Sequence, residues 1–122
     1  MALLRLSATA EADIISVLAW TESRFGELAP RRYERLLATA LRDVGADPEP
    51  AGSVLRPELG PGIRSYHLFH SRERARTDGA IVRRPRHFLL YRAMTPDLVG
   101  IGRVLHDAMD LERNLPLDYG DE

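Results

Sequence analysis

The sequence HFLLYRAMTPDLVGIGRVLH, residues 87–106, decides the fold. Its two ends, residues 87–92 and 98–105, are short and rich in aromatic and branched side chains, a composition typical of β-strands. The five residues between them, 93–97, include Pro96 and Asp97, which favour a turn. We therefore expect two antiparallel strands that are neighbours in one sheet and joined as a hairpin.

Two further segments have strand character. Residues 63–69 have the same composition, and they follow a segment, 47–61, that four prolines and two glycines keep irregular. The apolar run at residues 3–6 is a fourth candidate. The sequence therefore predicts a small antiparallel sheet of three or four strands.

The segment between residues 7 and 45 predicts a helical hairpin. Ser7 is suited to an N-cap and Gly26 to a stop, so the first helix is expected between them. Pro30 is suited to the first turn of a second helix, which carries an apolar stripe as far as Gly45. The linker is so short that the two helices must run antiparallel. The residues expected in the core are Leu18, Phe25, Leu37, Leu41, Phe88, Leu90, Ile101 and Leu105.

Two segments complete the predicted α+β architecture. Residues 71–86 hold six arginines and few apolar residues, which favours an extended hairpin tip or a loop that is mobile in the free protein. Residues 107–115 have the pattern of a short closing helix that Pro116 ends. We expect the acidic tail, residues 118–122, to be frayed.

Composition limits the class of protein. The 122 residues have the usual size of one domain, and 44% are apolar against 29% charged, so we expect a single domain over 1–122. No window approaches the ~18 apolar residues of a membrane span, which predicts a cytoplasmic protein. The absence of cysteine excludes disulfides, thiolate catalysis and sulfur-ligated zinc. We expect no cofactor.

The charge is distributed unevenly along the chain. Residues 56–106 hold ten arginines and four carboxylates, whereas residues 107–122 hold six carboxylates and one arginine. There is no lysine, and arginine makes planar, bidentate contacts with carboxylates and phosphates. This distribution predicts an acidic partner. The alternative is that arginine simply replaces lysine throughout and that these charges are solvated.

Three segments carry a resemblance to a known family: Gly62-Ile63-Arg64, Phe88-Leu89-Leu90-Tyr91-Arg92, and Ile101-Gly102-Arg103-Val104-Leu105-His106 followed by Met109-Asp110. In their order along the chain and in the residues that end each strand, these segments resemble the ParE toxins of the RelE/ParE superfamily. In that family a helical hairpin precedes a small antiparallel sheet, and an Arg-Val-Leu-His run ends the last strand. The similarity covers about residues 3–115. The connection at 71–86 is longer than a minimal hairpin of the family would need, and this difference could alter the choice of partner.

The resemblance implies a toxin that is neutralised by the flexible segment of a ParD-like antitoxin. ParE relatives are regarded as inhibitors of DNA gyrase, whereas RelE relatives cut messenger RNA on the ribosome. A shared fold does not choose between these targets. We expect a non-catalytic gyrase inhibitor, with a ribosome-dependent endoribonuclease as the alternative.

A metal-free nuclease would need an acid, a base and a cation on one face. The candidates are Arg64, Arg92 and Arg103 as phosphate clamps, His87 or His106 as acid or base, and Tyr91 as a stacking group or proton donor. Strand alternation separates them, because His87 and Tyr91 share one face while Arg92 points to the other. We therefore favour ordinary roles: Arg103 paired with a carboxylate, His106 near the last helix, and Tyr91 at the core edge.

Partner binding is the stronger expectation. His67 and His70 would face opposite sides of a strand, so we expect no metal site. The arginines at 71–86 could neutralise DNA phosphates, but interleaved stacking aromatics are missing and an acidic antitoxin would satisfy the same groups. The candidate partner-binding residues are Arg64, Arg72, Arg74, Arg76, Arg83, Arg84, Arg86, Arg92, Arg103, His106 and Met109.

Overall fold

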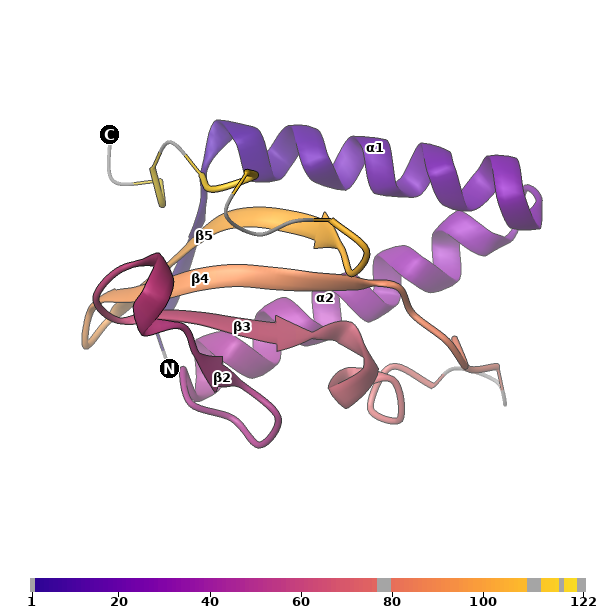
Figure 1. The fold of residues 1–122 in the computed structure, drawn as a ribbon. Coiled ribbons are helices and arrows are strands. Elements are labelled where there is room, and N and C mark those ends of the chain that lie inside the picture. Colours follow the sequence, from indigo (N-terminus) through magenta and orange to yellow (C-terminus); the bar gives the residue numbers. More distant parts are fainter. Residues whose placement is uncertain (1, 77–79, 110–112, 117, 121–122) are drawn as a thin grey trace.

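The computed structural model describes residues 2–76, 80–109, 113–116 and 118–120, and it has two layers. Two antiparallel helices cover one face of a five-stranded sheet (Figure 1). The elements in chain order are β1 (Leu3–Leu6), α1 (Ala8–Phe25), α2 (Ala29–Ala46), β2 (Val54–Leu55), β3 (Ile63–His67), β4 (His87–Thr95) and β5 (Leu98–His106). Single 3₁₀ turns, η1 (Pro57–Leu59) and η2 (Leu68–Ser71), flank β3. The predicted α+β class and the helical hairpin are confirmed.

The sheet corrects the predicted strand count. Its order is β1-β5-β4-β3-β2, with β1 parallel to β5 and the other three pairs antiparallel. The expectation of three or four antiparallel strands was therefore wrong in number and in one direction. The strand β2 lies inside the proline-rich segment 47–61, where two residues are enough to pair with Ser65 and Arg64. The parallel pair arises because the hairpin of α1 and α2 carries the chain across the sheet between β1 and β2.

Local signals place the helix ends. The Ser7 hydroxyl accepts a hydrogen bond from the Ala10 amide at 3.0 Å, as an N-cap does, and donates one to the Gly102 carbonyl at 2.8 Å. Gly26 ends α1 with φ of +94°, a conformation that favours glycine. Pro30 lies in the first turn of α2. The predicted caps are therefore confirmed, and Ser7 also fixes α1 to β5.

The main core lies between the helices and the sheet. Leu36, Leu37 and Val44 of α2 pack with Leu89 and Ile101 of the sheet in one buried cluster. Of the predicted core residues, Leu37, Phe88, Leu90, Ile101 and Leu105 are buried, and Leu18 and Leu41 pack partly buried against the cluster. Phe25 was predicted wrongly: it is 67% exposed, because it is the last residue of α1, at the tip of the hairpin.

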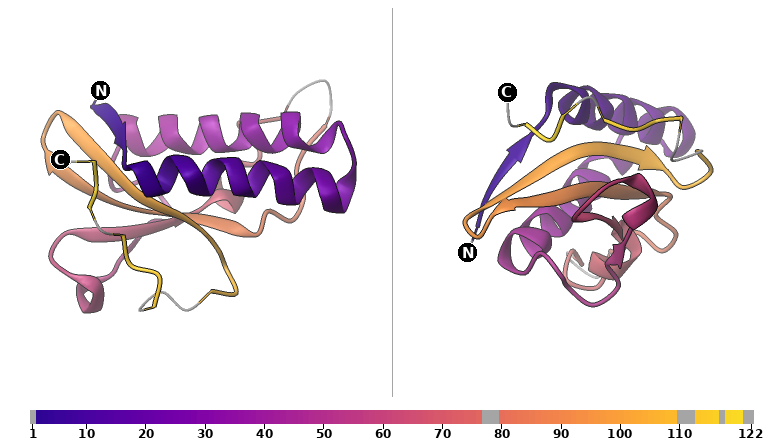
Figure 2. Two further views of the ribbon diagram at one scale, coloured as in Figure 1. Left: turned by 90° about the horizontal axis from the view of Figure 1, so that it is seen from above. Right: turned by 60° about the vertical axis from the view of Figure 1, so that its left-hand side comes forward.

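The segment after β5 differs most from its prediction. The described residues between 107 and 115 form turns, so the short closing helix is not shown. Residues 113–116 and 118–120 instead cross the sheet face opposite the helices (Figure 2). The Tyr119 side chain is 7% exposed there and packs with Ile63 and Leu90. The expectation of a frayed tail is therefore wrong for residues 118–120, because an aromatic ring anchors them, and residues 121–122 lie outside the described residues.

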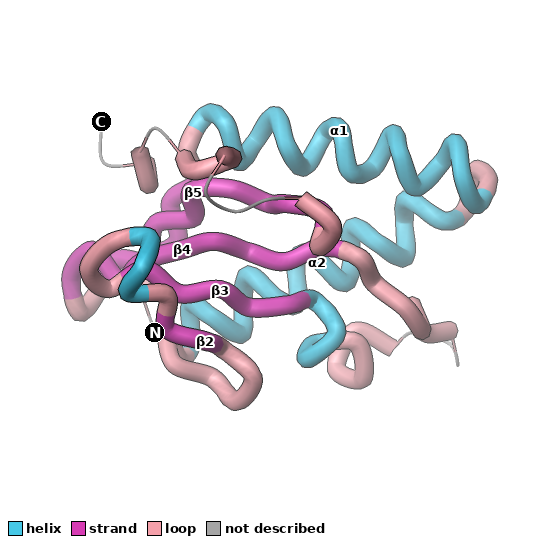
Figure 3. Tube along the Cα trace, in the orientation of Figure 1, coloured by secondary structure: helices cyan, strands magenta, loops and turns pink. Residues whose placement is uncertain are grey.

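The connection between β3 and β4 is mostly loop beyond η2 (Figure 3). Ser71 is fully buried, and Ala75 and Val82 pack against the main core, so apolar anchors are present where few were expected. Residues 77–79 lie outside the described residues, and the mobility of this connection in the free protein stays a prediction. Across the described residues, neither α1 nor α2 is long and apolar enough to cross a membrane.

Candidate functional site

The residues considered for nuclease chemistry do not converge on one site, although His87 and His106 are neighbours. The His87 imidazole lies beneath the helices, with Nδ1 2.6 Å from the Tyr33 hydroxyl. Tyr91 is fully buried, and its hydroxyl donates to the Pro48 carbonyl at 2.7 Å. Arg92 lies on the opposite face, where its guanidinium is 5.1 Å from the ring centroid of Tyr119. Strand β4 therefore directs these three candidates to two faces of the sheet.

Arg103 is bound within the chain. Its Nε and Nη2 donate to the two carboxylate oxygens of Asp13 on α1, at 2.7 and 3.0 Å, and its Nη1 donates to the Asn114 carbonyl at 3.1 Å. Asp13 also accepts from the Val104 amide at 2.9 Å. The hydrogen bonds to Asp13 raise the pKa of Arg103. The pairing with a carboxylate that was expected of Arg103 is therefore present, and it fixes α1 against β5.

Arg64 is also engaged. Its Nε and Nη2 donate to the Ser53 hydroxyl at 3.0 and 2.9 Å, and its Nη1 lies 3.6 Å from the carboxylate of Glu49. This guanidinium fastens the segment that leads into β2 to the middle of β3. A phosphate could bind Arg64 only by displacing these contacts.

Four rings from distant parts of the chain do meet. His87 and His106 are paired across β4 and β5, with centroids 5.2 Å apart, and Trp20 lies 5.1 and 5.7 Å from them. Tyr33 lies 5.4 Å from His87. Burial, and then the neighbouring His106, lower the pKa of His87 to about 4, so His87 is neutral at physiological pH. This cluster joins the helices to the sheet, and it buries His87 away from any substrate.

His106 lies at the half-buried end of β5. Its Nδ1 accepts from the Ala108 amide at 3.1 Å and so shapes the turn after the strand. The next residue, Asp107, accepts from Arg86 at 2.9 Å and lies 3.2 Å from His67 Nε2. Burial raises the pKa of Asp107, but the hydrogen bonds from Arg86 and His67 outweigh it and hold that pKa below its usual range.

Intrachain ion pairs divide the arginines of the connection into two groups. Arg74 binds Asp43, Arg76 binds Glu73, and Arg86 binds Asp107, each at 2.8 or 2.9 Å. Within the described residues, Arg72, Arg83 and Arg84 make no ion pair. Met109 is 46% exposed. The arginines of the connection thus separate into those that bind a carboxylate of the chain and those that, among the described residues, make no ion pair.

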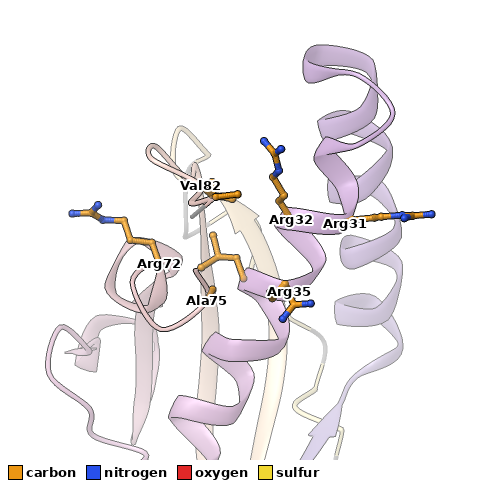
Figure 4. Close-up of a pocket in the computed structure, with 8 residues that line it drawn as sticks. Arg31, Arg32, Arg35, Arg72, Ala75 and Val82 are labelled. Atoms are coloured by element: carbon orange, nitrogen blue, oxygen red, sulfur yellow. The ribbon is translucent and has the colours of Figure 1, made fainter. Parts of the chain in front are cut away.

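Helix α2 adds three arginines that the sequence analysis missed. Arg31, Arg32 and Arg35 line a pocket of about 290 Å³ together with Arg72 (Figure 4). Its other lining residues are Leu36, Ala75, Ala80 and Val82. The available signal was helical spacing, because positions 31, 32 and 35 fall on the exposed side of the stripe that contains Tyr33 and Leu36.

A second pocket of about 260 Å³ adjoins the first and shares Arg32 and Val82 with it. It is more apolar, because it is lined by Trp20, Phe25 and Ile81, with Arg83 and Arg84 beside them. We call the six arginines that line these two pockets the arginine surface: Arg31, Arg32, Arg35, Arg72, Arg83 and Arg84. Among the described residues, no group of three histidines or carboxylates is arranged to hold a metal ion.

Comparison with known proteins places the chain in a family. No curated protein matches the chain. The family model described as the ParE toxin of the type II toxin-antitoxin system, parDE, matches residues 4–111. The match runs from β1 through both helices to the end of β5, and it includes the arginines of α2 and of the connection. Because it covers most of the sequence, the chain belongs to the ParE family of toxins from type II toxin-antitoxin systems.

Proposed function

We propose that this toxin inhibits DNA gyrase by binding to it and not by cleaving RNA. The observation that carries the proposal is the dispersal of the nuclease candidates over two faces of the sheet. His87 is neutral and buried beneath the helices, whereas Arg92 lies on the other face against Tyr119. Catalysis of RNA cleavage needs an acid, a base and a cation within reach of one phosphate.

The C-terminal segment adds support. Residues 113–116 and 118–120 occupy part of the sheet face opposite the helices, and Arg103 is held by Asp13 and the Asn114 carbonyl. A nuclease site on that face would have to displace this segment, and a site that used Arg103 would have to break its largely buried ion pair with Asp13. A protein interface makes no such demand, because it spreads its energy over several anchors. Gyrase as the target also favours a cytoplasmic location.

A ParD-like antitoxin is the proposed neutralising partner. Type II systems pair the toxin with an antitoxin, and the arginine surface offers six guanidiniums without a carboxylate among the described residues. An acidic segment would supply those carboxylates, and the adjoining apolar pocket beside Trp20 and Phe25 could accept one of its apolar side chains. Arg72, Arg83 and Arg84 keep the partner role proposed from the sequence. His106 and Met109 lie nearer the end of β5.

The target is tested by controlled expression. Expression should induce the DNA-damage response and filamentation, and purified protein should trap gyrase on cleaved DNA while bulk messenger RNA stays intact. His106→Ala should weaken toxicity only in part, because no single group performs catalysis. Rapid codon-biased messenger cleavage with normal supercoiling, abolished by His106→Ala, would assign the ribosome instead.

The partner is tested by co-expression with the small open reading frame adjacent to the toxin gene. Its product should restore growth and copurify with the toxin. The double variant Arg32→Glu/Arg72→Glu should lose most of this copurification, whereas Arg42→Glu, on the same helix but outside both pockets, should retain it. Rescue without any copurifying protein would contradict neutralisation by binding.

A further inference from the structure

The first turns of α2 carry an unfavourable arrangement of charge. Arg31, Arg32 and Arg35 are exposed there, and the first turn holds no acidic side chain. The amino end of a helix has a partial positive charge, so cations destabilise it and carboxylates stabilise it. Helix α1 follows that rule with Glu11 in its first turn. Arg31 and Arg32, in the first turn of α2, therefore act against helix stability, and a bound anion would remove that repulsion.

The directions of these side chains indicate the shape of the anion. In Figure 4 the guanidiniums of Arg31, Arg32, Arg35 and Arg72 point away from one another and not into the pocket between them. A single small ion could not contact all four. An extended polyanion presents charges at many positions, since duplex DNA carries one negative charge about every 1.7 Å along its axis.

Most of the aromatic side chains near these arginines are engaged within the chain, although Phe25 is 67% exposed. The Arg72 guanidinium lies 4.0 Å from the ring centroid of Phe69, and that of Arg24 lies 5.8 Å from Trp20. Trp20 also contacts Tyr33 and His87 edge to face. Single-stranded nucleic acid is bound by stacking successive bases on open aromatic faces. This arrangement favours contacts to the backbone of a duplex.

We propose that the arginine surface of the free toxin binds the phosphate backbone of duplex DNA, without reading its sequence. Guanidiniums in this surface donate to phosphate oxygens of neighbouring nucleotides, and no base contact is needed. The antitoxin proposed above would occupy the same arginines, so its binding and that of DNA are mutually exclusive. The inference does not depend on gyrase being the target.

The test is fluorescence anisotropy of a labelled 20-base-pair duplex with purified, antitoxin-free toxin. Binding should be detectable at 50 mM salt and should weaken about 100-fold by 200 mM salt, as four phosphate contacts require. The triple variant Arg31→Gln/Arg32→Gln/Arg35→Gln should bind at least tenfold more weakly with a shallower salt dependence. Arg42→Gln, an exposed arginine farther along α2, should leave both quantities unchanged.

Other outcomes would overturn the proposal. One is equal binding of the duplex by the triple variant and the wild type. Another is tighter binding to a single strand than to the duplex, with that binding abolished by Phe25→Ala. A third is binding of a glutamate-rich peptide without any binding of the duplex. Thermal unfolding of the triple variant, expected at or above the wild-type temperature, shows that the fold is intact. Wild-type toxin that traps gyrase but does not bind the duplex would reject the duplex site and leave the proposed function standing.

Discussion

The Tyr33 hydroxyl of α2 lies 2.6 Å from Nδ1 of His87 on β4, and it also accepts the Arg86 amide at 3.0 Å. One hydroxyl thus joins the helical layer to the strand and to the connection that precedes it. Burial raises the pKa of Tyr33 to about 12 and lowers that of His87 to about 4, so both groups are neutral at physiological pH. The hydroxyl satisfies both partners when it donates to Nδ1 of His87 and accepts from the Arg86 amide. Nδ1 then carries no proton, so the neutral His87 ring is protonated on Nε2.

Removing that hydroxyl should destabilise the fold. Tyr33→Phe leaves the buried Nδ1 of His87 and the Arg86 amide without their partner, and each such loss costs about 1–3 kcal/mol. Urea denaturation at pH 7 should show the decrease in the free energy of unfolding. Thr39→Ala, which removes an exposed hydroxyl from the same helix, should change that free energy by less than about 0.5 kcal/mol. Equal effects from the two variants would contradict a structural role for Tyr33.

The buried imidazole should make stability depend on pH. The pKa of His87 is about 4 in the folded chain against an ordinary 6.5, so the unfolded chain binds more protons between these values. Its contribution to stability is therefore fully present above about pH 6.5 and is lost as the pH falls toward 4, by up to about 3 kcal/mol.

The variant His87→Phe isolates this contribution. Its free energy of unfolding should change less between pH 7 and pH 4.5 than that of the wild type, because a phenylalanine ring at this position cannot take up a proton in the unfolded chain. The measurement is urea denaturation at both pH values. A steeper pH dependence in the variant would show that other groups dominate in this range.

The ion pair between Asp13 and Arg103 distinguishes a structural arginine from a phosphate clamp. Both side chains are less than one fifth exposed, and Asp13 also accepts the Val104 amide. Asp13→Ala should therefore lower the free energy of unfolding by about 2–3 kcal/mol, as much as Arg103→Ala or more. Growth inhibition should fall in parallel for both variants. If Asp13→Ala freed Arg103 for catalysis and strengthened toxicity, the structural role would be wrong.

The close approach of the C-terminal segment to β5 should make two glycines intolerant of substitution. A Cβ at Gly102 would lie 2.6 Å from Pro116 Cγ and 2.7 Å from Tyr119 Cε1, and one at Gly100 would overlap the Tyr119 carbonyl. Gly102→Ala should cost about 1–3 kcal/mol in the full chain. In a chain that ends at Leu115, the same substitution should be nearly neutral. Gly45→Ala, whose Cβ would lie 3.3 Å from the Leu4 side chain, is the matched control.

The parts of the fold that the sequence determined depend on neighbours in the chain. Ser7 and Gly26 bound α1 because capping and a positive φ are properties of single residues and the next turn. Residues 96–97 turn the hairpin of β4 and β5 for the same reason. The separation of His87 from Arg92 also followed from strand alternation, which is a local property.

Only the tertiary structure decided which charged side chains pair and which strands lie side by side. Arg103 finds Asp13 ninety residues away, β1 lies parallel to β5, and Tyr119 covers the sheet, although none of these partners is marked by local pattern. The arginine surface is likewise assembled from α2 and the connection, because burial of Tyr33, Leu36 and Val82 brings those two segments together. Periodicity reports which side of an element is apolar, whereas the partner of a charge depends on how the packed elements are oriented.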